Sequence, residues 1–161
     1  MNRKFKIFLA VFIFIVVLDL LTKEIAVRFL SQVEKVSVIP GLFDLTLVWN
    51  RGAAFGILSE APEIIRKLVL IGASSVAAVI TVIYSYIKRF SLSYWEMVFL
   101  ALIAGGAVGN LYDRIFIGAV RDFFDFYIKN YHWPAFNIAD TSISIGITGF
   151  IIYELFFKKK S

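Results

Sequence analysis

The chain has 161 residues, 60% of which are apolar, and it contains 17 phenylalanines but no cysteine. Ordinary soluble domains are about 45–50% apolar, so this composition excludes that class and predicts a single domain embedded in a bilayer. The missing cysteine excludes disulfides and a thiol nucleophile. The formal net charge of +5 does not indicate nucleic-acid binding, because the basic residues form short clusters beside apolar runs.

Four apolar stretches of membrane-spanning length follow one another along the chain. Each is close to the roughly 20 residues that cross a bilayer as a helix. They cover about Phe5–Leu30, Leu68–Ile87, Tyr94–Tyr112 and Ile138–Phe157. The first begins like a signal peptide, but no small-residue cleavage site follows its apolar run, so we interpret it as an uncleaved membrane helix.

Four crossings put both termini on the same side of the membrane. Basic clusters flank the crossings on that side and identify it as the cytoplasm. The clusters are Arg3, Lys4 and Lys6; Lys88 and Arg89; and Lys158–Lys160. The two long connections between helices then lie on the outer side.

The first outer connection contains a strand pattern. In Phe43–Asn50 the odd positions are all apolar and the even positions are mostly polar, which predicts a strand with one buried face. Pro40-Gly41 is a turn signal, and Val36–Ile39 is the expected antiparallel partner. We therefore expect a small antiparallel β-cradle over about Val36–Gly56, on the outer face.

The second outer connection is interpreted as a short amphipathic helix over Arg121–Asn130, with its phenylalanines dipping into the membrane interface. Trp95 and Trp133 suit interfacial anchors. The predicted fold is thus a mainly α membrane protein with four transmembrane helices, a small extracytoplasmic antiparallel β-cradle and a short interfacial helix.

Polar residues embedded in the apolar stretches are predicted to gather at the outer face. They are Asp19, Lys23, Asn110, Asp113, Arg114 and Asp140. Ionisable groups near hydrocarbon are costly and therefore indicate a functional site.

Two carboxylates that share one proton can hydrolyse an amide, because the ionised one activates water and the protonated one donates to the substrate. Four aspartates are eligible: Asp113, Asp122, Asp125 and Asp140. Asp113 is followed by Arg114, and we interpret it as part of a hydrogen-bonded cluster at a helix end. Asp125 lies one helical turn from Asp122 and is expected to face water. Each of the four could also be an ordinary solvated or capping residue, and spacing alone does not select a pair.

Other catalytic mechanisms are disfavoured because the sequence lacks most of the residues that they need. His132 is the only histidine, so a zinc site or a Ser/His/Asp triad is disfavoured. A Ser/Lys dyad that uses Lys23 stays open in principle. Gly105–Gly109 lies inside an apolar helix, which favours close helix packing over a phosphate loop. Asn50 and Gly52 are compatible either with simple turn chemistry or with strand-like binding of an extended peptide.

Read together, five segments resemble the bacterial lipoprotein signal peptidases, the type II signal peptidases. They occur in the family's order and at compatible spacing, and they span nearly the whole chain. The segments are Asp19–Lys23, Asn50–Phe55, Gly105–Arg114, Val120–Phe123 and Pro134–Thr141.

The resemblance implies an aspartyl endopeptidase of the bacterial inner membrane that cuts diacylglyceryl-modified prolipoproteins just before the lipidated cysteine. Asp122 and Asp140 match the catalytic dyad. The positions that match site-lining residues are Asn50, Gly52, Asn110, Arg114 and Asn137, and the supporting positions are Asp19, Lys23 and Asp113. The resemblance also implies inhibition by the cyclic peptide globomycin. We expect a monomer surrounded by lipid that needs no metal or other cofactor.

Two rival interpretations remain. A small transporter could use buried Asp and Lys as an ion path, although Leu68–Ile87 carries no polar stripe. A structural assembly factor would use its aspartates only for capping and pairing.

Overall fold

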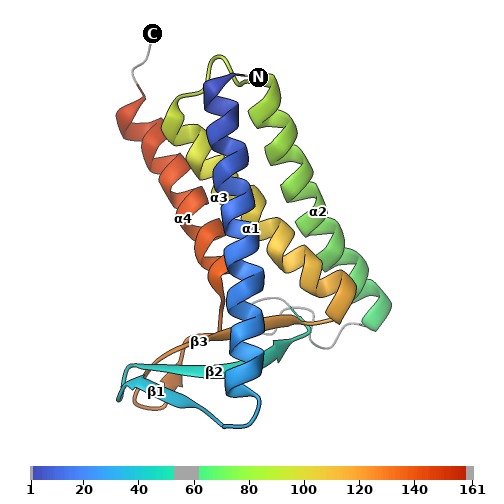
Figure 1. The fold of residues 1–161 in the computed structure, drawn as a ribbon, viewed down its shortest axis with the longest axis vertical. Helices are drawn as coiled ribbons and strands as arrows, with labels where there is room; N and C mark the ends of the chain where they lie inside the picture. The colour runs from blue at the N-terminus through green and yellow to red at the C-terminus, as the bar shows by residue number, and fades with distance from the viewer. Residues whose placement is uncertain (1, 53–61, 159–161) are drawn as a thin grey trace.

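The structure is a computed structural model that describes residues 2–52 and 62–158. Four helices form a bundle, and a small sheet lies across one end of it (Figure 1). The helices are α1 (Arg3–Leu30), α2 (Glu63–Ile87), α3 (Tyr94–Tyr112) and α4 (Ile138–Ile152). The strands are β1 (Val36–Ile39), β2 (Phe43–Asn50), β3 (Val120–Ile128) and β4 (Tyr131–His132). The mainly helical fold with a small sheet confirms the predicted class.

In the described part of the chain, four helices are long and apolar enough to cross a membrane, so the chain is a multi-pass membrane protein. The third helix has its predicted bounds, whereas α2 begins at Glu63 rather than Leu68. Two helices continue into π-helical turns, η2 (Asp113–Ile117) after α3 and η3 (Tyr153–Phe157) after α4. Gly118, at φ 81°, ends η2 and turns the chain towards β3.

The α3 helix is the centre of the bundle and packs against the other three helices. Its buried face consists largely of small residues, which let neighbouring backbones approach closely. They include Ala101, Ala104, Gly105, Gly106, Ala107 and Gly109. This packing supports the interpretation of Gly105–Gly109 as a helix contact.

Gly106 is expected to tolerate no side chain. A Cβ there would collide with the carbonyl oxygen of Ala139 and lie 2.8 Å from Cγ1 of Ile143, so α4 would have to shift. Gly106→Ala should lower the free energy of unfolding by about 1–3 kcal/mol. Gly72→Ala is the matched control, because a Cβ at Gly72 meets no described atom within 4 Å. Thermal unfolding of both variants in detergent tests this, and equal melting temperatures would contradict it.

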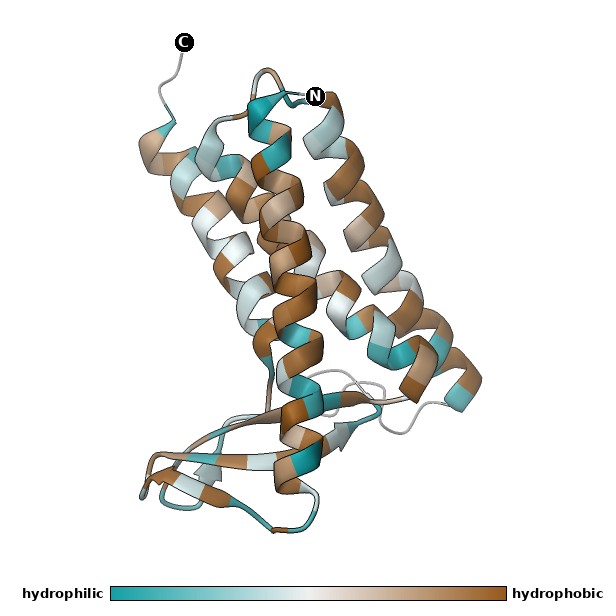
Figure 2. Cartoon of the chain, viewed as in Figure 1, coloured by the Kyte–Doolittle hydropathy of each residue, from teal (hydrophilic) through white to brown (hydrophobic). Residues whose placement is uncertain are grey.

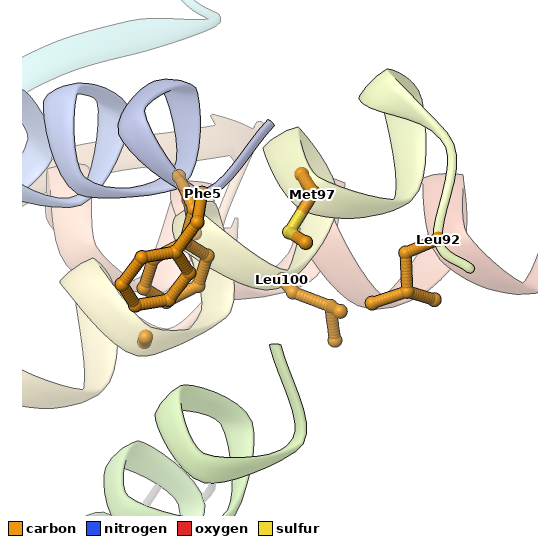
Figure 3. Close-up of a cluster of buried hydrophobic side chains, with 7 residues drawn as sticks. Phe5, Leu92, Met97 and Leu100 are labelled. Atoms are coloured by element: carbon orange, nitrogen blue, oxygen red, sulfur yellow. The ribbon is translucent and has the colours of Figure 1, made fainter. Parts of the chain in front are cut away.

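At the end of the bundle away from the sheet, a hydrophobic cluster holds α1 against α3. Figure 3 shows Phe5, Leu92, Met97 and Leu100 in this cluster. The Lys4 ammonium donates to the carbonyl oxygen of Leu92 at 2.5 Å, which ties the start of α1 to the α2–α3 turn. Hydrophobic residues lie along the helices, and hydrophilic residues lie at both ends of the bundle (Figure 2).

The predicted interfacial helix over Arg121–Asn130 is wrong, because Val120–Ile128 forms strand β3. The sheet has the order β1-β2-β3-β4, and all neighbouring pairs are antiparallel. The predicted pairing of Val36–Ile39 with Phe43–Asn50 is confirmed, while the last residues assigned to the β-cradle lie outside the described part.

Strand pairing explains why Val120–Ile128 is not a helix. Aromatic residues favour strands, and cross-strand aromatic pairs stabilise them. Phe126 lies opposite Phe43 with ring centroids 4.5 Å apart, and Phe124 lies opposite Leu45. Without β3, the long strand β2 would keep one edge unpaired.

Both faces of β2 contain side chains that contact other parts of the protein. Leu45 and Leu47 pack on the end of α1, as the alternation predicted, although Trp49 stays exposed. On the other face Asp44 is fully buried and accepts hydrogen bonds from Lys35 at 2.8 Å and Tyr127 at 3.2 Å. The hydrogen bond from Lys35 holds the pKa of the Asp44 carboxyl below its usual value.

Candidate active site

Asp122 of β3 and Asp140 of α4 line one cavity where the sheet meets the bundle. The cavity has a volume of about 490 Å³. Its polar lining includes Asn50, Gly52 and Arg114 besides the two aspartates. Its apolar lining includes Val120, Trp133, Pro134, Ala135, Phe136, Ile143 and Ile145. A space of this kind fits an amphipathic chain beside two carboxyl groups.

Strand pairing positions Asp122. An irregularity between Leu45 and Val48 shifts the β2–β3 register, so that Val48 lies opposite Asp122. Asn50, two residues further along β2, donates its amide to Oδ2 of Asp122 at 3.0 Å. The backbone N–H of Gly52 donates to Oδ1 of Asn50 at 2.9 Å and so fixes the orientation of that amide. Such irregularities often redirect side chains next to active sites.

The environment of Asp122 favours its protonated form. The residue is only 2% exposed. Burial raises its pKa to about 7, and the negative charge of Asp140 adds to this increase. At neutral pH, Asp122 is therefore poised between the acid and the carboxylate, as a proton-transfer group must be.

Asp140 takes part in the cap of α4 and also lines the cavity. Asn137 and Asp140 form a capping box at the start of α4, in which each side chain accepts from the other's backbone N–H, at 3.0 and 3.2 Å. The other carboxylate oxygen, Oδ1, accepts the amide of Asn110 at 2.8 Å. Both oxygens are thus held in place before any substrate binds.

Asn137 connects the two aspartates. Its amide nitrogen lies 2.7 Å from Oδ1 of Asp122 and 3.2 Å from Oδ1 of Asn110. The residue is fully buried, so these bonds fix its orientation. One side chain therefore caps α4 and ties β3 to it, which brings together two carboxylates that are distant in the sequence.

A buried charge cluster lies behind this layer. The Lys23 ammonium is 2.7 Å from Asp19, 3.4 Å from Asp113 and 2.9 Å from the amide oxygen of Asn110. Arg121 completes the cluster by donating to Asp113 at 2.7 Å. Asp19 also accepts the backbone N–H of Ala139 at 2.9 Å. The cluster thereby joins α1, α3, β3 and α4 around the site.

The structure brings together all ten residues that the sequence singled out. Five line the cavity, namely Asn50, Gly52, Arg114, Asp122 and Asp140. Two, Asn110 and Asn137, hold the aspartates. Three, Asp19, Lys23 and Asp113, lie in the charge cluster.

Asp125, the remaining eligible aspartate, pairs with His132 at 2.9 Å and does not line the cavity. Sequence reasoning missed Arg121 as a partner of Asp113. It considered capping for Asp140 but did not identify Asn137 as the cap of α4, although Asn137-x-x-Asp140 has the spacing of a capping box.

The fold and site define a membrane enzyme with an acidic centre at one end of its helix bundle. A solved bacterial membrane enzyme matches with a TM-score of 0.78 and 30% identity over 100% of this chain and 98% of its own. A second one has the same TM-score and 31% identity over 94% of each chain.

The family model for signal peptidase (SPase) II matches residues 11–157. The lipoprotein signal peptidase of Sulfurihydrogenibium sp. is 58% identical over 99% of this chain and 98% of its own length. That of Aquifex aeolicus is 42% identical over 95% and 87%. The chain therefore belongs to the lipoprotein signal peptidase family, whose members remove signal peptides from prolipoproteins.

Proposed function

We propose that the chain is an aspartyl endopeptidase that cleaves diacylglyceryl-modified prolipoproteins immediately before the lipidated cysteine, with Asp122 and Asp140 as its catalytic dyad. The observation that supports this most is that both carboxyl groups line one cavity and share Asn137 as a hydrogen-bonding partner. The apolar residues that line the same cavity suit the lipid-modified part of the substrate, which must remain in contact with the bilayer.

In the proposed mechanism the dyad holds one proton at rest. The raised pKa of Asp122 assigns that proton to Asp122 and leaves Asp140 as the base. Asp140 takes a proton from water, the water oxygen attacks the scissile carbonyl carbon, and Asp122 protonates the carbonyl oxygen. When the resulting intermediate collapses, the C–N bond breaks, Asp140 protonates the leaving amine, and Asp122 regains its proton. Asn110 and Asn137 keep the carboxylates aligned throughout.

We propose that the sheet end of the bundle faces the outside of the bacterial inner membrane. At the opposite end, where α1 begins, α2 ends and η3 is followed by Lys158, basic residues outnumber acidic ones, whereas those of the sheet end are interspersed with acidic residues. Positive charge of this kind favours the cytoplasmic side. The dyad would then lie where the scissile bond of a lipid-anchored precursor emerges from the membrane.

Cleavage is expected to require the lipid. Purified protein in detergent should cut a diacylglyceryl-modified precursor before its cysteine and leave the unmodified precursor intact, because only the former places its scissile bond beside the dyad. Mass spectrometry of the products tests both the requirement and the position of the cut. A globomycin-type cyclic peptide should block the reaction. Equal cleavage of both precursors would argue against lipid-dependent recognition.

A further inference from the structure

A second cavity adjoins the candidate active site. Its volume is about 320 Å³, and it lies between the start of α2, the end of β2 and the turn that follows α3. Asn50 and Arg114 line both cavities. In Figure 1 the elements that enclose it meet where the end of α3 approaches the start of α2, beside the sheet. The proposed chemistry does not use this space.

The cavity is strongly basic. Four cationic side chains line it against one acidic side chain; they are Arg51, Arg66, Lys67 and Arg114, with Glu63. Glu63 and Lys67 form an ion pair, with the ammonium 2.5 Å from the carboxylate, so Arg51, Arg66 and Arg114 account for the net positive charge of the lining. Arg114 donates one guanidinium nitrogen to Ser74 at 2.9 Å, but its Nε is buried and has no hydrogen-bond partner among the described residues. An excess of positive charge around a cavity favours an anionic ligand.

Apolar side chains also line this cavity. Trp49, Leu70, Ile71 and Ile117 contribute to its lining. On the first turns of α2, Ile64 and Leu68 are 73% and 69% exposed, as expected of side chains that face acyl chains. A membrane helix meets the headgroup layer where its apolar span begins, and Arg66 and Lys67 lie at that level. The ligand that fits is therefore amphiphilic, with an anionic head and a hydrocarbon tail.

We propose that this cavity binds the headgroup of an anionic phospholipid from the surrounding leaflet. The phosphate lies among Arg66, Lys67 and Arg114, and the acyl chains run along the exposed face of α2. Because Arg114 also lines the dyad's cavity, the bound lipid supports one wall of the candidate active site. This inference concerns lipid binding and stands independently of the aspartyl mechanism.

Native mass spectrometry of the full chain, released from detergent with equal amounts of phosphatidylglycerol and phosphatidylcholine of the same acyl chains, tests the proposal. The wild type should retain one phosphatidylglycerol in preference to phosphatidylcholine. Arg66→Gln/Lys67→Gln should reduce that preference about tenfold, the effect of losing roughly one charge-assisted hydrogen bond. Arg28→Gln/Lys129→Gln is the matched control, since it removes the same charge from exposed positions at the same end, outside the cavity.

The outcomes separate the proposal from its rivals. An unchanged preference in the control together with a lost preference in the cavity variant supports a specific site. Equal losses in both variants would indicate only general surface attraction and would overturn it, as would a wild type without preference. Displacement of the lipid by inorganic phosphate alone would show a free-anion site instead. Single variants, Arg66→Gln and Lys67→Gln, serve if the double variant does not fold, and their melting temperatures report folding.

Discussion

Replacing Asp122 or Asp140 with asparagine is expected to slow prolipoprotein cleavage by about a thousandfold or more, because general acid–base catalysis contributes on the order of 10²–10⁴ and neither role can be filled by an amide. Asn at either position is nearly isosteric with Asp, so insertion and the overall fold should be retained. Asp125→Asn is the matched control. Because Asp125 pairs with His132 outside the cavity, the Asp125→Asn variant should cleave prolipoprotein at the wild-type rate. Cleavage at the wild-type rate by either dyad variant would overturn the assignment.

Stability at different pH values tests the raised pKa of Asp122. Folding raises the pKa of this carboxyl from 3.8 to about 7. Between these values the folded state holds a proton that the unfolded chain has released, so this group's contribution to wild-type stability falls as the pH rises from about 4 to 7. Asp122→Asn has no such loss. The melting temperature of the variant, relative to the wild type, should therefore increase from pH 5 to pH 8.

The same group predicts the pH dependence of the rate. If the dyad needs one shared proton, cleavage should fall above pH 7 as Asp122 ionises, by about tenfold for each pH unit. A rate that keeps rising to pH 9 would show that this proton is not needed. A structural aspartate would instead give a variant that is less stable than the wild type at every pH, with lost cleavage as a secondary effect.

The sequence predicted α3 and β2 correctly, because each is marked by a pattern within its own residues. The bounds of α3 followed from an uninterrupted apolar run, and β2 followed from its alternation. Val120–Ile128 was different, because apolar residues at 120, 124, 126 and 128 fit a strand, whereas the adjacent pair Phe123 and Phe124 breaks that alternation and favoured the helix interpretation. The pairing with β2 decides between them, and the paired residues lie 70 to 83 positions apart in the sequence. Such a non-local partner cannot be read from periodicity.

The candidate catalytic pair also could not be chosen from sequence spacing and required the contacts seen in the structure. Asp113, Asp122, Asp125 and Asp140 were equal by spacing. In the structure, Arg121 neutralises Asp113 and His132 pairs with Asp125, whereas the carboxyl groups of Asp122 and Asp140 accept only amide and backbone N–H groups within the described contacts. Asp113 is as buried as Asp122, so its ion pair with Arg121 sets it apart, whereas Asp125 is set apart by its position outside the cavity.

Lys23→Met is expected to destabilise the protein by about 3–5 kcal/mol, the usual cost of removing one partner from a buried ion pair. Lys23 is fully buried, and its removal leaves the carboxylates of Asp19 and Asp113 with Arg121 as the only cation of the cluster. Arg28→Met is the matched control, because Arg28 pairs with Glu24 at the surface and its side chain is 73% exposed. That change should cost less than about 1 kcal/mol.

A second substitution should recover part of the loss. Asp19→Asn removes the unbalanced charge and keeps an oxygen that can accept the backbone N–H of Ala139, which Asp19 binds at 2.9 Å. Lys23→Met/Asp19→Asn should therefore be more stable than Lys23→Met alone, and a double-mutant cycle of thermal unfolding in detergent measures the coupling. Purely additive effects would mean that the two charges do not depend on each other. That result would contradict the interpretation of Lys23 and Asp19 as a coupled buried ion pair.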